Sequence, residues 1–328
     1  MKQRWIITVL FFVIGGSVGY GARWLLFRPP VKQNGIKAVR QSGYTLTNPL
    51  LECEVGDQES FGEIRLFRTK LQSAVDRIIS SKKADHVSVY FRDLNNGPWM
   101  GINEKEVFSP SSLLKVPLMM SVYQLAEKNS KILDTKVLYN GTEDKDATQN
   151  VRPSVELEPT IEYTYEQLVE RMIIYSDNNA AKLLSQEVKE AAFFRPYDEL
   201  GIEAPVLQRG EYYLRVKDYA TFFRVLFNSS YLTREYSEKA LGLLLKSEFK
   251  DGLVAGVPQG VLVAHKFGER IWEDTKEHQM HDCGIVYFPN NPYLLCVMTR
   301  GADFSSLGTV IHDISKLVYD EVAAQRKK

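Results

Sequence analysis

The sequence predicts an α+β protein in which an antiparallel sheet, flanked by the first and last helices, adjoins an all-helical lobe. Strand patterns occur at both ends of the globular region, whereas residues from about 113 to 250 are mainly helical in pattern. Hydrophobic residues make up 44% of the chain and charged residues 25%, which is typical of a globular protein. Pairing the early and late strands in one sheet is the simplest arrangement, and it leaves a cleft between sheet and lobe.

The globular region begins with a helix and two strands. Ser60-Phe61-Gly62-Glu63 has the pattern of a capping box, and apolar residues then recur on one face of a helix to about residue 81. Alternation and β-branching predict a strand over 86–91. The sequence Asn95-Asn96-Gly97 predicts a turn into a second strand that runs through Ile102.

The middle and the end of the chain complete the predicted architecture. The helical pattern predicts helices over 113–128, 165–175, from near 179, 217–228 and 233–246. Strands are predicted over 261–267, 283–288 and 293–299, the last two joined by Pro289-Asn290-Asn291-Pro292. An amphipathic helix over 305–324 closes the chain.

The N-terminal segment predicts export. Residues 1–28 begin with a basic tetrapeptide, and Trp5–Ala22 runs without a charge, which is long enough for a membrane anchor. A signal peptide cleaved near Ser17-Val18-Gly19 is the alternative. Residues 29–57 are rich in turn-forming pairs and are predicted to be a linker. The globular domain is predicted to span 58–328.

Charge and cysteine content exclude several classes of protein. The 41 basic residues balance 41 acidic residues without a basic stripe, which argues against a nucleic-acid partner. Three cysteines are too few for a disulfide framework. Cys283 and Cys296 fall on one predicted hairpin and could be neighbours, but we expect two reduced core cysteines. His278, His281 and Asp282 fall in a predicted polar loop without supporting ligand spacing, so we predict no metal and no cofactor.

The first candidate for chemistry is Ser112, which precedes Lys115 by one helical turn. In the first turn of a helix, backbone N–H groups lack partners within the helix. A hydroxyl, an amine that accepts its proton and unpaired N–H donors are the parts of an acyl-transfer nucleophile. Ser80–Lys83 and Ser247–Lys250 fit the same S-x-x-K pattern, so the pattern alone does not single out Ser112.

Two further motifs do single it out. Ser176-Asp177-Asn178 follows Ser112 by 64 residues at the end of a predicted helix, and Lys266-Phe267-Gly268 follows by another 90 on a predicted strand. The ordered set S-x-x-K, S-D-N and K-T-G is the signature of class A β-lactamases and penicillin-binding proteins. The sequence therefore resembles the class A β-lactamase-like serine hydrolases of the penicillin-recognising superfamily over about residues 58–326. Taken alone, Ser176-Asp177-Asn178 could also end one helix and cap the next.

The resemblance implies a β-lactamase/transpeptidase-like fold and a role for each motif residue. Ser112 is expected to attack a lactam or peptide carbonyl and form an acyl-enzyme. Lys115, with a pKa depressed by desolvation and a second cation, is expected to act as the base. Ser176 is expected to relay a proton to the leaving nitrogen, and Asn178 to bind the side-chain amide of the substrate.

The strand motif is expected to complete substrate binding. Lys266 and Gly268 are expected to bind substrate, with Lys266 supplying positive charge for its carboxylate and lowering the pKa of Lys115. The backbone N–H groups of Ser112 and Glu269 are expected to form the oxyanion hole. We expect the Glu269 side chain itself to lie in a turn.

The sequence departs from the family pattern at two points. Phe267 stands where the family has a hydroxyl residue that helps bind the substrate carboxylate. The loop that carries the deacylating glutamate in class A β-lactamases is shortened. Glu199, Glu203 and Glu211 are the remaining glutamates, and none is assigned to the role, although the position of Glu211 fits best. The first departure predicts weak recognition of typical β-lactams, and the second predicts slow deacylation.

The expected function is therefore that of an exported bacterial serine hydrolase. Its substrates are β-lactams or D-Ala-D-Ala-type peptidoglycan stem peptides, and the N-terminal helix anchors it in the cytoplasmic membrane, or it is secreted after cleavage. The alternative is a membrane-anchored cell-wall binding module with the same fold and little or no catalysis.

Overall fold

The computed structural model of the chain describes residues 34–325, apart from 41–42, 44, 58, 96–97, 143, 148, 189, 204–205 and 209–210. The side chains of 34–40, 50–66, 190–191, 206–208 and 211 are also outside the description, including those of the predicted capping box. The predicted anchor or signal segment, residues 1–28, lies outside the described residues. Within the part that is described, no helix has both the length and the apolar character needed to cross a membrane.

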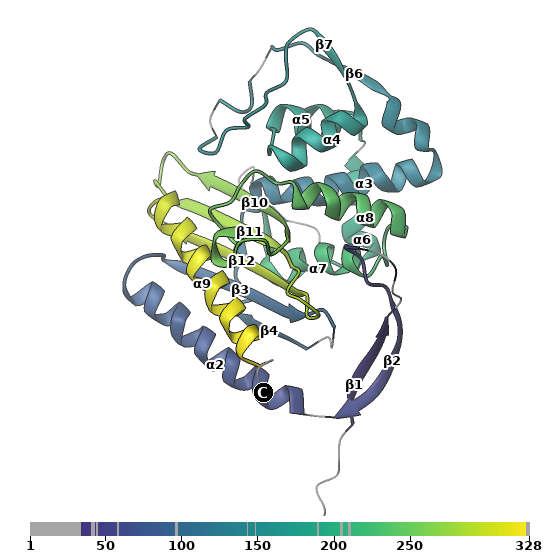
Figure 1. Cartoon of the computed structure of the whole chain (residues 1–328). Coiled ribbons are helices and arrows are strands. Elements are labelled where there is room, and N and C mark those ends of the chain that lie inside the picture. The colour runs from purple at the N-terminus through teal and green to yellow at the C-terminus, as the bar shows by residue number, and fades with distance from the viewer. Residues whose placement is uncertain are drawn as a thin grey trace, which may run out of the picture.

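A five-stranded antiparallel sheet forms the centre of the fold, with the strand order β10-β11-β12-β3-β4 (Figure 1). The pairing of β12 with β3 joins the late strands to the early strands, which confirms the predicted sheet. Because β10 is at one end of this order, its outer edge can lie against the segment that carries Ser112. The five strands are β3 (His86–Asp93), β4 (Trp99–Ile102), β10 (Val263–Ile271), β11 (His278–Val286) and β12 (Tyr293–Gly301).

The first and last helices of the domain, α2 (Glu59–Ser80) and α9 (Phe304–Gln325), lie side by side on one face of the sheet, as predicted (Figure 1). Their apolar sides, including Leu71 and Ile311, share one buried cluster with sheet residues such as Val297. The burial of these aliphatic side chains provides the main driving force for this layer.

The helical lobe lies on the other side of the sheet (Figure 1). Its large buried cluster contains Leu113, Met119, Phe222 and Phe223. The helices are α3 (Lys115–Lys128), α4 (Tyr165–Ile174), α5 (Asn178–Glu187), α6 (Glu190–Glu199), α7 (Val216–Phe227) and α8 (Arg234–Leu245). The sequence did not predict α6, which has Pro196 in its interior.

Short elements connect these layers and were not predicted, because two to five residues carry too little periodicity. The strand β5 pairs with β9, which in turn pairs with β8, and β6 pairs with β7. Three 3₁₀ turns also occur in the described chain: η1 (Ser111–Leu114), η2 (Ser130–Asp134) and η3 (Val254–Gly256). The strands are β5 (Val107–Phe108), β6 (Lys136–Tyr139), β7 (Ile161–Thr164), β8 (Val206–Gln208) and β9 (Glu211–Arg215).

The predicted linker contains regular structure that the sequence pattern did not indicate. Residues in it form two antiparallel strands, β1 (Asn34–Arg40) and β2 (Leu50–Asp57). Between them the chain docks on the domain: the Leu46 backbone N–H donates to Glu238 of α8 at 2.8 Å, and the Tyr287 hydroxyl donates to the Leu46 carbonyl at 3.0 Å. This part of the segment is thus anchored to the helical lobe.

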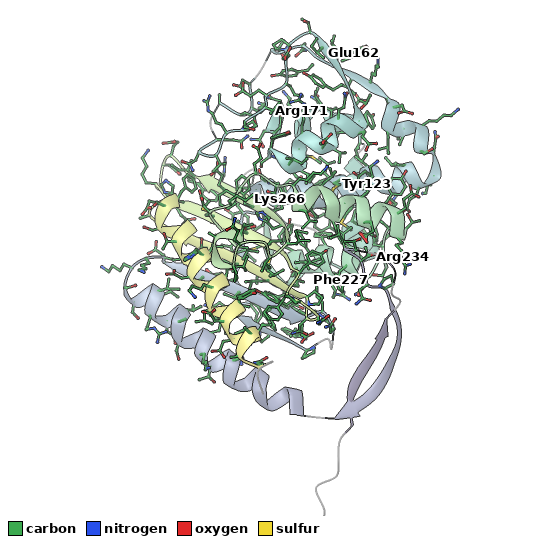
Figure 2. All side chains as sticks on the ribbon, viewed as in Figure 1. Tyr123, Glu162, Arg171, Phe227, Arg234 and Lys266 are labelled. Carbon is green, nitrogen blue, oxygen red and sulfur yellow. A yellow bond between two sulfur atoms is a disulfide. The ribbon has the colours of Figure 1, made fainter. Side chains whose placement is uncertain are left out.

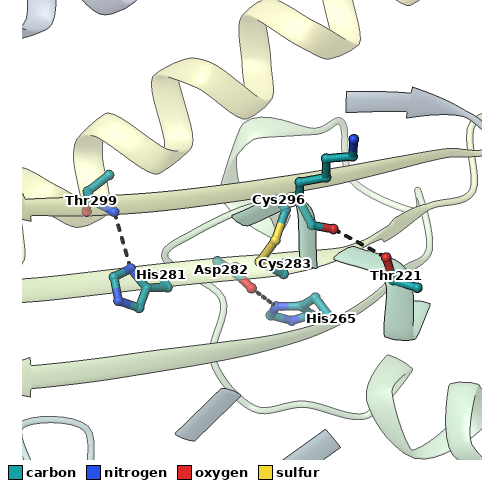
Figure 3. The surroundings of a disulfide bond; sticks show 8 residues. Thr221, His265, His281, Asp282, Cys283, Cys296 and Thr299 are labelled. Carbon is teal, nitrogen blue, oxygen red and sulfur yellow. Dashed lines mark hydrogen bonds and ion pairs between the residues drawn. A yellow bond between two sulfur atoms is a disulfide. The ribbon is translucent and has the colours of Figure 1, made fainter. Parts of the chain in front are cut away.

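Strand β11 corrects two expectations. It begins at His278, so His278, His281 and Asp282 lie on a strand and not in a polar loop. Cys283 and Cys296, expected to be reduced, form a disulfide between β11 and β12 (Figure 3). They are opposite each other in the strand register, which places their side chains on the same face of the sheet and within bonding reach.

Candidate active site

Ser112 lies in a tight turn between a short strand and a long helix. The strand β5 ends at Phe108, the 3₁₀ turn η1 contains Ser112, and α3 begins directly at Lys115. The helix predicted from residue 113 therefore begins two residues later, after the 3₁₀ turn. Ser111 has a φ of 48°, a left-handed conformation that a residue with a Cβ rarely adopts. Strain of this kind is common at functional sites, and here it directs the chain into the turn that presents Ser112.

Lys115 is buried and its ammonium group is surrounded by acceptors. Its Nζ donates to the Ser176 carbonyl oxygen at 2.5 Å, to Asn178 Oδ1 at 2.6 Å and to Ser176 Oγ at 3.2 Å. Burial lowers its pKa to about 7, against the opposing attraction of Asp146, Asp177 and Glu269. A lysine with this pKa is substantially neutral at physiological pH and can accept a proton.

The Ser176-Asp177-Asn178 motif caps a helix and also lies beside the two lysines. It ends α4 and begins α5, and the Asp177 side chain caps α5 by accepting from the Ala180 N–H at 2.7 Å. Ser176 is fully buried and has a φ of 60°. Its hydroxyl lies within hydrogen-bond distance of both lysines. Asn178 accepts from Lys115 and donates to the Lys145 carbonyl at 3.2 Å.

Lys266 meets the same hydroxyl from the sheet. Figure 2 shows it between the sheet and the helical lobe, and it is fully buried. Its Nζ donates to Ser176 Oγ at 2.9 Å and to the Phe267 carbonyl at 3.0 Å. Burial first, and then the charge of Lys115, lower the pKa of Lys266 well below its usual value. The structure thus brings Lys115, Ser176, Asn178 and Lys266 together, as the motifs predict.

Phe267 does more than remove a hydroxyl. Its ring is buried and stacks on Phe249 with ring centroids 4.2 Å apart. Lys266 Nζ lies 4.2 Å from the centroid of the same ring, within range of a cation–π contact. With one flank against an aromatic ring and its hydrogen bonds directed inward, Lys266 is not among the residues that line the Ser112 cavity.

Gly268 is required by the close approach of β10 to the Ser112 turn. A Cβ at this position would lie 2.7 Å from the Pro110 carbonyl oxygen and 3.1 Å from Leu113 Cγ. Real Cβ atoms do not approach a carbonyl oxygen this closely, so only glycine allows the strand to reach the turn. This packing explains the glycine, and its predicted part in substrate binding stays a prediction.

Glu269 lies on β10 and not in a turn, which corrects the expectation for its side chain. Its carboxylate accepts from the Val151 backbone N–H at 2.8 Å and from Asn150 Nδ2 at 3.3 Å. Ser112 and Glu269 line the same cavity, and the oxyanion hole formed by their N–H groups stays a prediction. The side chain also places a negative charge on the wall of that cavity.

Asp146 is a site residue that the sequence gave no reason to select. It is buried, and it accepts from the Asn178 backbone N–H at 2.7 Å and from Asn179 Nδ2 at 2.7 Å. It also accepts from Gln149. Among the charges that raise the pKa of Lys115, that of Asp146 has the largest effect. The loop around it has no motif, so only the fold could reveal this contact.

The cavity has a volume of about 450 Å³ and combines the nucleophile with strand β10 and the loop before β7. Ser112 is partly exposed at its wall. Arg270 and Trp272 extend the wall along the strand, with the guanidinium carbon 5.4 Å from the centroid of the Trp272 ring. The lining residues are Ser112, Gln149, Asn150, Asn178, Glu269, Arg270, Ile271, Trp272, Glu273 and Phe304.

Two of the three candidates for a deacylating glutamate, Glu199 and Glu203, do not reach this cavity. Glu199 accepts from Gln124 at 2.8 Å, and Glu203 forms an ion pair with Arg215. Neither belongs to the cavity wall. Glu211 is the first residue of β9, and its side chain lies outside the described part.

The arrangement agrees with what comparison with known proteins shows. The chain matches the model of the β-lactamase enzyme family over residues 70–322. The chain belongs to the β-lactamase enzyme family. No curated protein matches it significantly.

Solved structures share the fold of this chain. A β-lactamase from Sphaerobacter thermophilus is 22% identical with a TM-score of 0.67, and the match covers 77% of this chain and 96% of that chain. The TLA-1 extended-spectrum β-lactamase is 18% identical with a TM-score of 0.68, covering 77% and 98%. PBP-A is 21% identical with a TM-score of 0.65, covering 78% and 97%. The fold is thus β-lactamase/transpeptidase-like.

Proposed function

We propose that this β-lactamase-family protein is a serine hydrolase that forms a Ser112 acyl-enzyme with β-lactams or D-Ala-D-Ala-type cell-wall peptides. The observation that carries the proposal is the hydrogen-bonded group of Lys115, Ser176 and Lys266 beside the cavity that Ser112 lines. A neutral lysine, a hydroxyl that can pass a proton and a nucleophile at a cavity wall are the parts that amide cleavage through an acyl-enzyme requires.

The proposed reaction uses each of these groups. Neutral Lys115 accepts the Ser112 hydroxyl proton as Oγ attacks the carbonyl carbon, and the N–H groups of Ser112 and Glu269 stabilise the oxyanion. When the C–N bond breaks, the proton passes from Lys115 through the Ser176 hydroxyl to the leaving nitrogen. An ester remains on Ser112, and water hydrolyses it to free the carboxylic acid.

We expect this ester to be hydrolysed slowly. The carboxylates on the described cavity wall are Glu269, which binds the Val151 N–H, and Glu273, which binds Lys276 and is 78% exposed. The contacts of these two carboxylates bind them to other groups, and do not orient either one to activate a water beside Ser112. A slow final step is the property of a penicillin-binding peptidase, and it separates this proposal from an efficient β-lactamase.

Intact mass spectrometry after addition of a reporter penicillin tests the proposal. The wild-type protein is expected to gain the mass of one penicillin and to lose it slowly, and Ser112→Ala is expected to gain none. Ser80→Ala is the matched control, because Ser80 belongs to another S-x-x-K sequence but is exposed on α2. Labelling of Ser112→Ala would refute the role of Ser112, and fast turnover of a chromogenic cephalosporin would refute slow deacylation.

A binding module with little catalysis is the second candidate, and the burial of Lys266 behind Phe267 favours it. Without a cation on the cavity wall at this position, a substrate carboxylate loses its expected partner. Retained binding of peptidoglycan fragments, without acylation by any acyl donor, would support this candidate. Slow but stoichiometric acylation, or release of D-alanine from a stem peptide, would reject it.

For the location, we propose the cell envelope, with residues 1–28 as the anchor or as a cleaved signal peptide. The Cys283–Cys296 disulfide supports a domain outside the cytoplasm, because disulfides persist in oxidising compartments. Fractionation of cells, followed by N-terminal sequencing of the mature protein, distinguishes an anchored from a secreted form.

A further inference from the structure

The chain that leads into the Ser112 turn has no ladder of backbone hydrogen bonds with the central sheet. Its strand, β5, pairs only with β9 among the described strands, and these belong to a separate small sheet. Acyl transfer nevertheless requires a fixed distance between Ser112 on this chain and the N–H groups and lysine on β10. Some other contact must therefore hold the turn in register with the sheet.

Side chains of β11 supply that contact at Ser109. The Ser109 backbone N–H donates to Gln279 Oε1 at 3.0 Å, and His281 Nε2 lies 2.9 Å from the Ser109 carbonyl oxygen. Gln279 and His281 are two residues apart, so they project from the same face of the strand. One residue, three positions before the nucleophile, thus has both of its backbone polar groups bound by the central sheet.

Each of these side chains is itself fixed in orientation. His281 Nδ1 accepts from the Thr299 backbone N–H at 3.2 Å, so the proton of the neutral ring is on Nε2 and points at Ser109. Gln279 Nε2 donates to Glu277 at 3.0 Å, which leaves Oε1 for the Ser109 N–H. Both side chains are buried, at 1% exposure or less, so water does not compete for these bonds.

Packing around the segment reinforces the attachment. The Phe108 ring meets the His281 ring edge-on with centroids 5.5 Å apart, and Arg300 Nη2 donates to the Val107 carbonyl at 3.0 Å. On the other side of the turn, Gly268 fits directly beneath the Pro110 carbonyl. The turn is therefore located between β10 and the Ser109 contacts.

We propose that Gln279 and His281 are positioning residues, which hold the Ser109 backbone so that Ser112 Oγ stands at its working distance from Lys115 and the oxyanion donors. The inference rests on the proposed function, since acylation is the step that the position controls. Neither residue lines the Ser112 cavity, so both act through the Ser109 backbone. Their polar character is the reason that this part of β11 resembles a loop in sequence.

The test compares variants that keep or remove the contacts, in the full-length protein. His281→Leu and Gln279→Met remove one contact each, whereas His281→Gln keeps a donor that can reach the Ser109 carbonyl. Val297→Ala is the control, because it removes buried methyl groups from the cluster shared with α2 and α9 and lowers stability without touching Ser109. Thermal unfolding measures how stable each variant is.

Acylation by a reporter penicillin should slow about 10- to 100-fold in His281→Leu and Gln279→Met, as expected for a displacement of the nucleophile by about 1 Å. The non-covalent affinity should stay unchanged, and His281→Gln should recover most of the rate. Acylation that slows no more than in an equally destabilised Val297→Ala would overturn the inference. If instead the wild-type protein is never acylated, it is the proposed function that fails.

A second measurement does not depend on acylation. Hydrogen–deuterium exchange of a peptide that covers residues 107–114 should accelerate in His281→Leu and Gln279→Met, but not in Val297→Ala. Unchanged exchange in the first two variants would overturn the inference. A variant that is too unstable for kinetic assays can be compared in this measurement at low temperature.

Discussion

Lys266 Nζ and Ser176 Oγ lie 2.9 Å apart, and this contact joins the sheet to the helical lobe at the centre of the site. Lys115 Nζ approaches the same hydroxyl at 3.2 Å from α3. Two lysines that share one hydroxyl in a buried place cannot both remain charged without a large cost in free energy. Burial lowers the pKa of both lysines, and the charge of Lys115 lowers that of Lys266 further, which supplies a neutral amine for catalysis.

The pKa of Lys115 predicts how acylation depends on pH. A base must be neutral to accept the Ser112 proton, and the pKa of Lys115 is lowered to about 7. The acylation rate should therefore rise with pH, pass half of its maximum near pH 7 and level off above it. Stopped-flow acylation between pH 5 and 9 measures this profile, and Lys115→Met should lower the plateau by about 10²- to 10⁴-fold. A rate that is flat across this range would exclude Lys115 as the base.

Asp146→Asn should shift that profile toward lower pH. The Asp146 charge stabilises the protonated form of Lys115, so its removal lowers the pKa of Lys115 further. In the wild-type protein, Asn179 Nδ2 donates to an Asp146 carboxylate oxygen at 2.7 Å. The substitution weakens this charge-assisted hydrogen bond and should lower the free energy of unfolding by about 1–3 kcal/mol. The pH–rate profile and urea unfolding give the two readouts. A profile that moves toward higher pH would contradict the electrostatic role.

Gly268→Ala should impair acylation more than stability. The new methyl group would lie 2.7 Å from the Pro110 carbonyl oxygen and must push β10 away from the Ser112 turn. A displacement of about 1 Å between nucleophile and oxyanion donors can cost about 100-fold in rate. Gly242→Ala on α8 is the matched control, because a Cβ there meets no atom within 4 Å. Equal acylation rates in the two variants would show that β10 does not contribute to the site.

Removal of the Cys283–Cys296 disulfide should affect stability. The bond closes a loop with a sequence separation of 13, for which the entropy of the unfolded chain predicts a contribution of about 2–3 kcal/mol. Cys283→Ala/Cys296→Ala should lower the free energy of unfolding by this amount in denaturant titrations. A reducing agent should destabilise the wild-type protein but leave the double variant unchanged. If the reducing agent affects both proteins alike, the disulfide is not the cause.

Sequence patterns predicted the elements with a clear hydrophobic periodicity and the residues that belong to a motif. The central sheet and its flanking helices follow from periodicity, and Ser112, Lys115, Ser176 and Lys266 follow from ordered motifs. What the patterns missed is set by single tertiary contacts. The residues at the start of β11 are polar because they bind the Ser109 backbone and other internal groups, and that reason exists only in the folded protein.

The same limit explains the site residues that were missed or misplaced. Asp146 gains its role because its carboxylate accepts from the N–H of Asn178, the first residue of α5, and Glu269 gains its role because its carboxylate accepts from the Val151 N–H. Neither contact is encoded by local spacing. Phe267 was noticed in the sequence as a lost hydroxyl, but the pattern could not reveal that its ring also covers the Lys266 ammonium group.

Glu269→Gln should favour acyl donors that carry a carboxylate. Glutamine can still accept from the Val151 N–H, so the loop contact is retained while the negative charge on the cavity wall is removed. A penicillin and its methyl ester form a matched pair of donors, one anionic and one neutral. Their ratio of acylation rates cancels any change in Lys115, because both donors react with the same base.

We expect the ratio to shift about tenfold toward the anion, equivalent to about 1.4 kcal/mol. Arg270→Gln is the control, since it removes the cation on the same wall and should shift the ratio in the opposite direction. A ratio that Glu269→Gln leaves unchanged would mean that the carboxylate holds the loop but does not select the substrate.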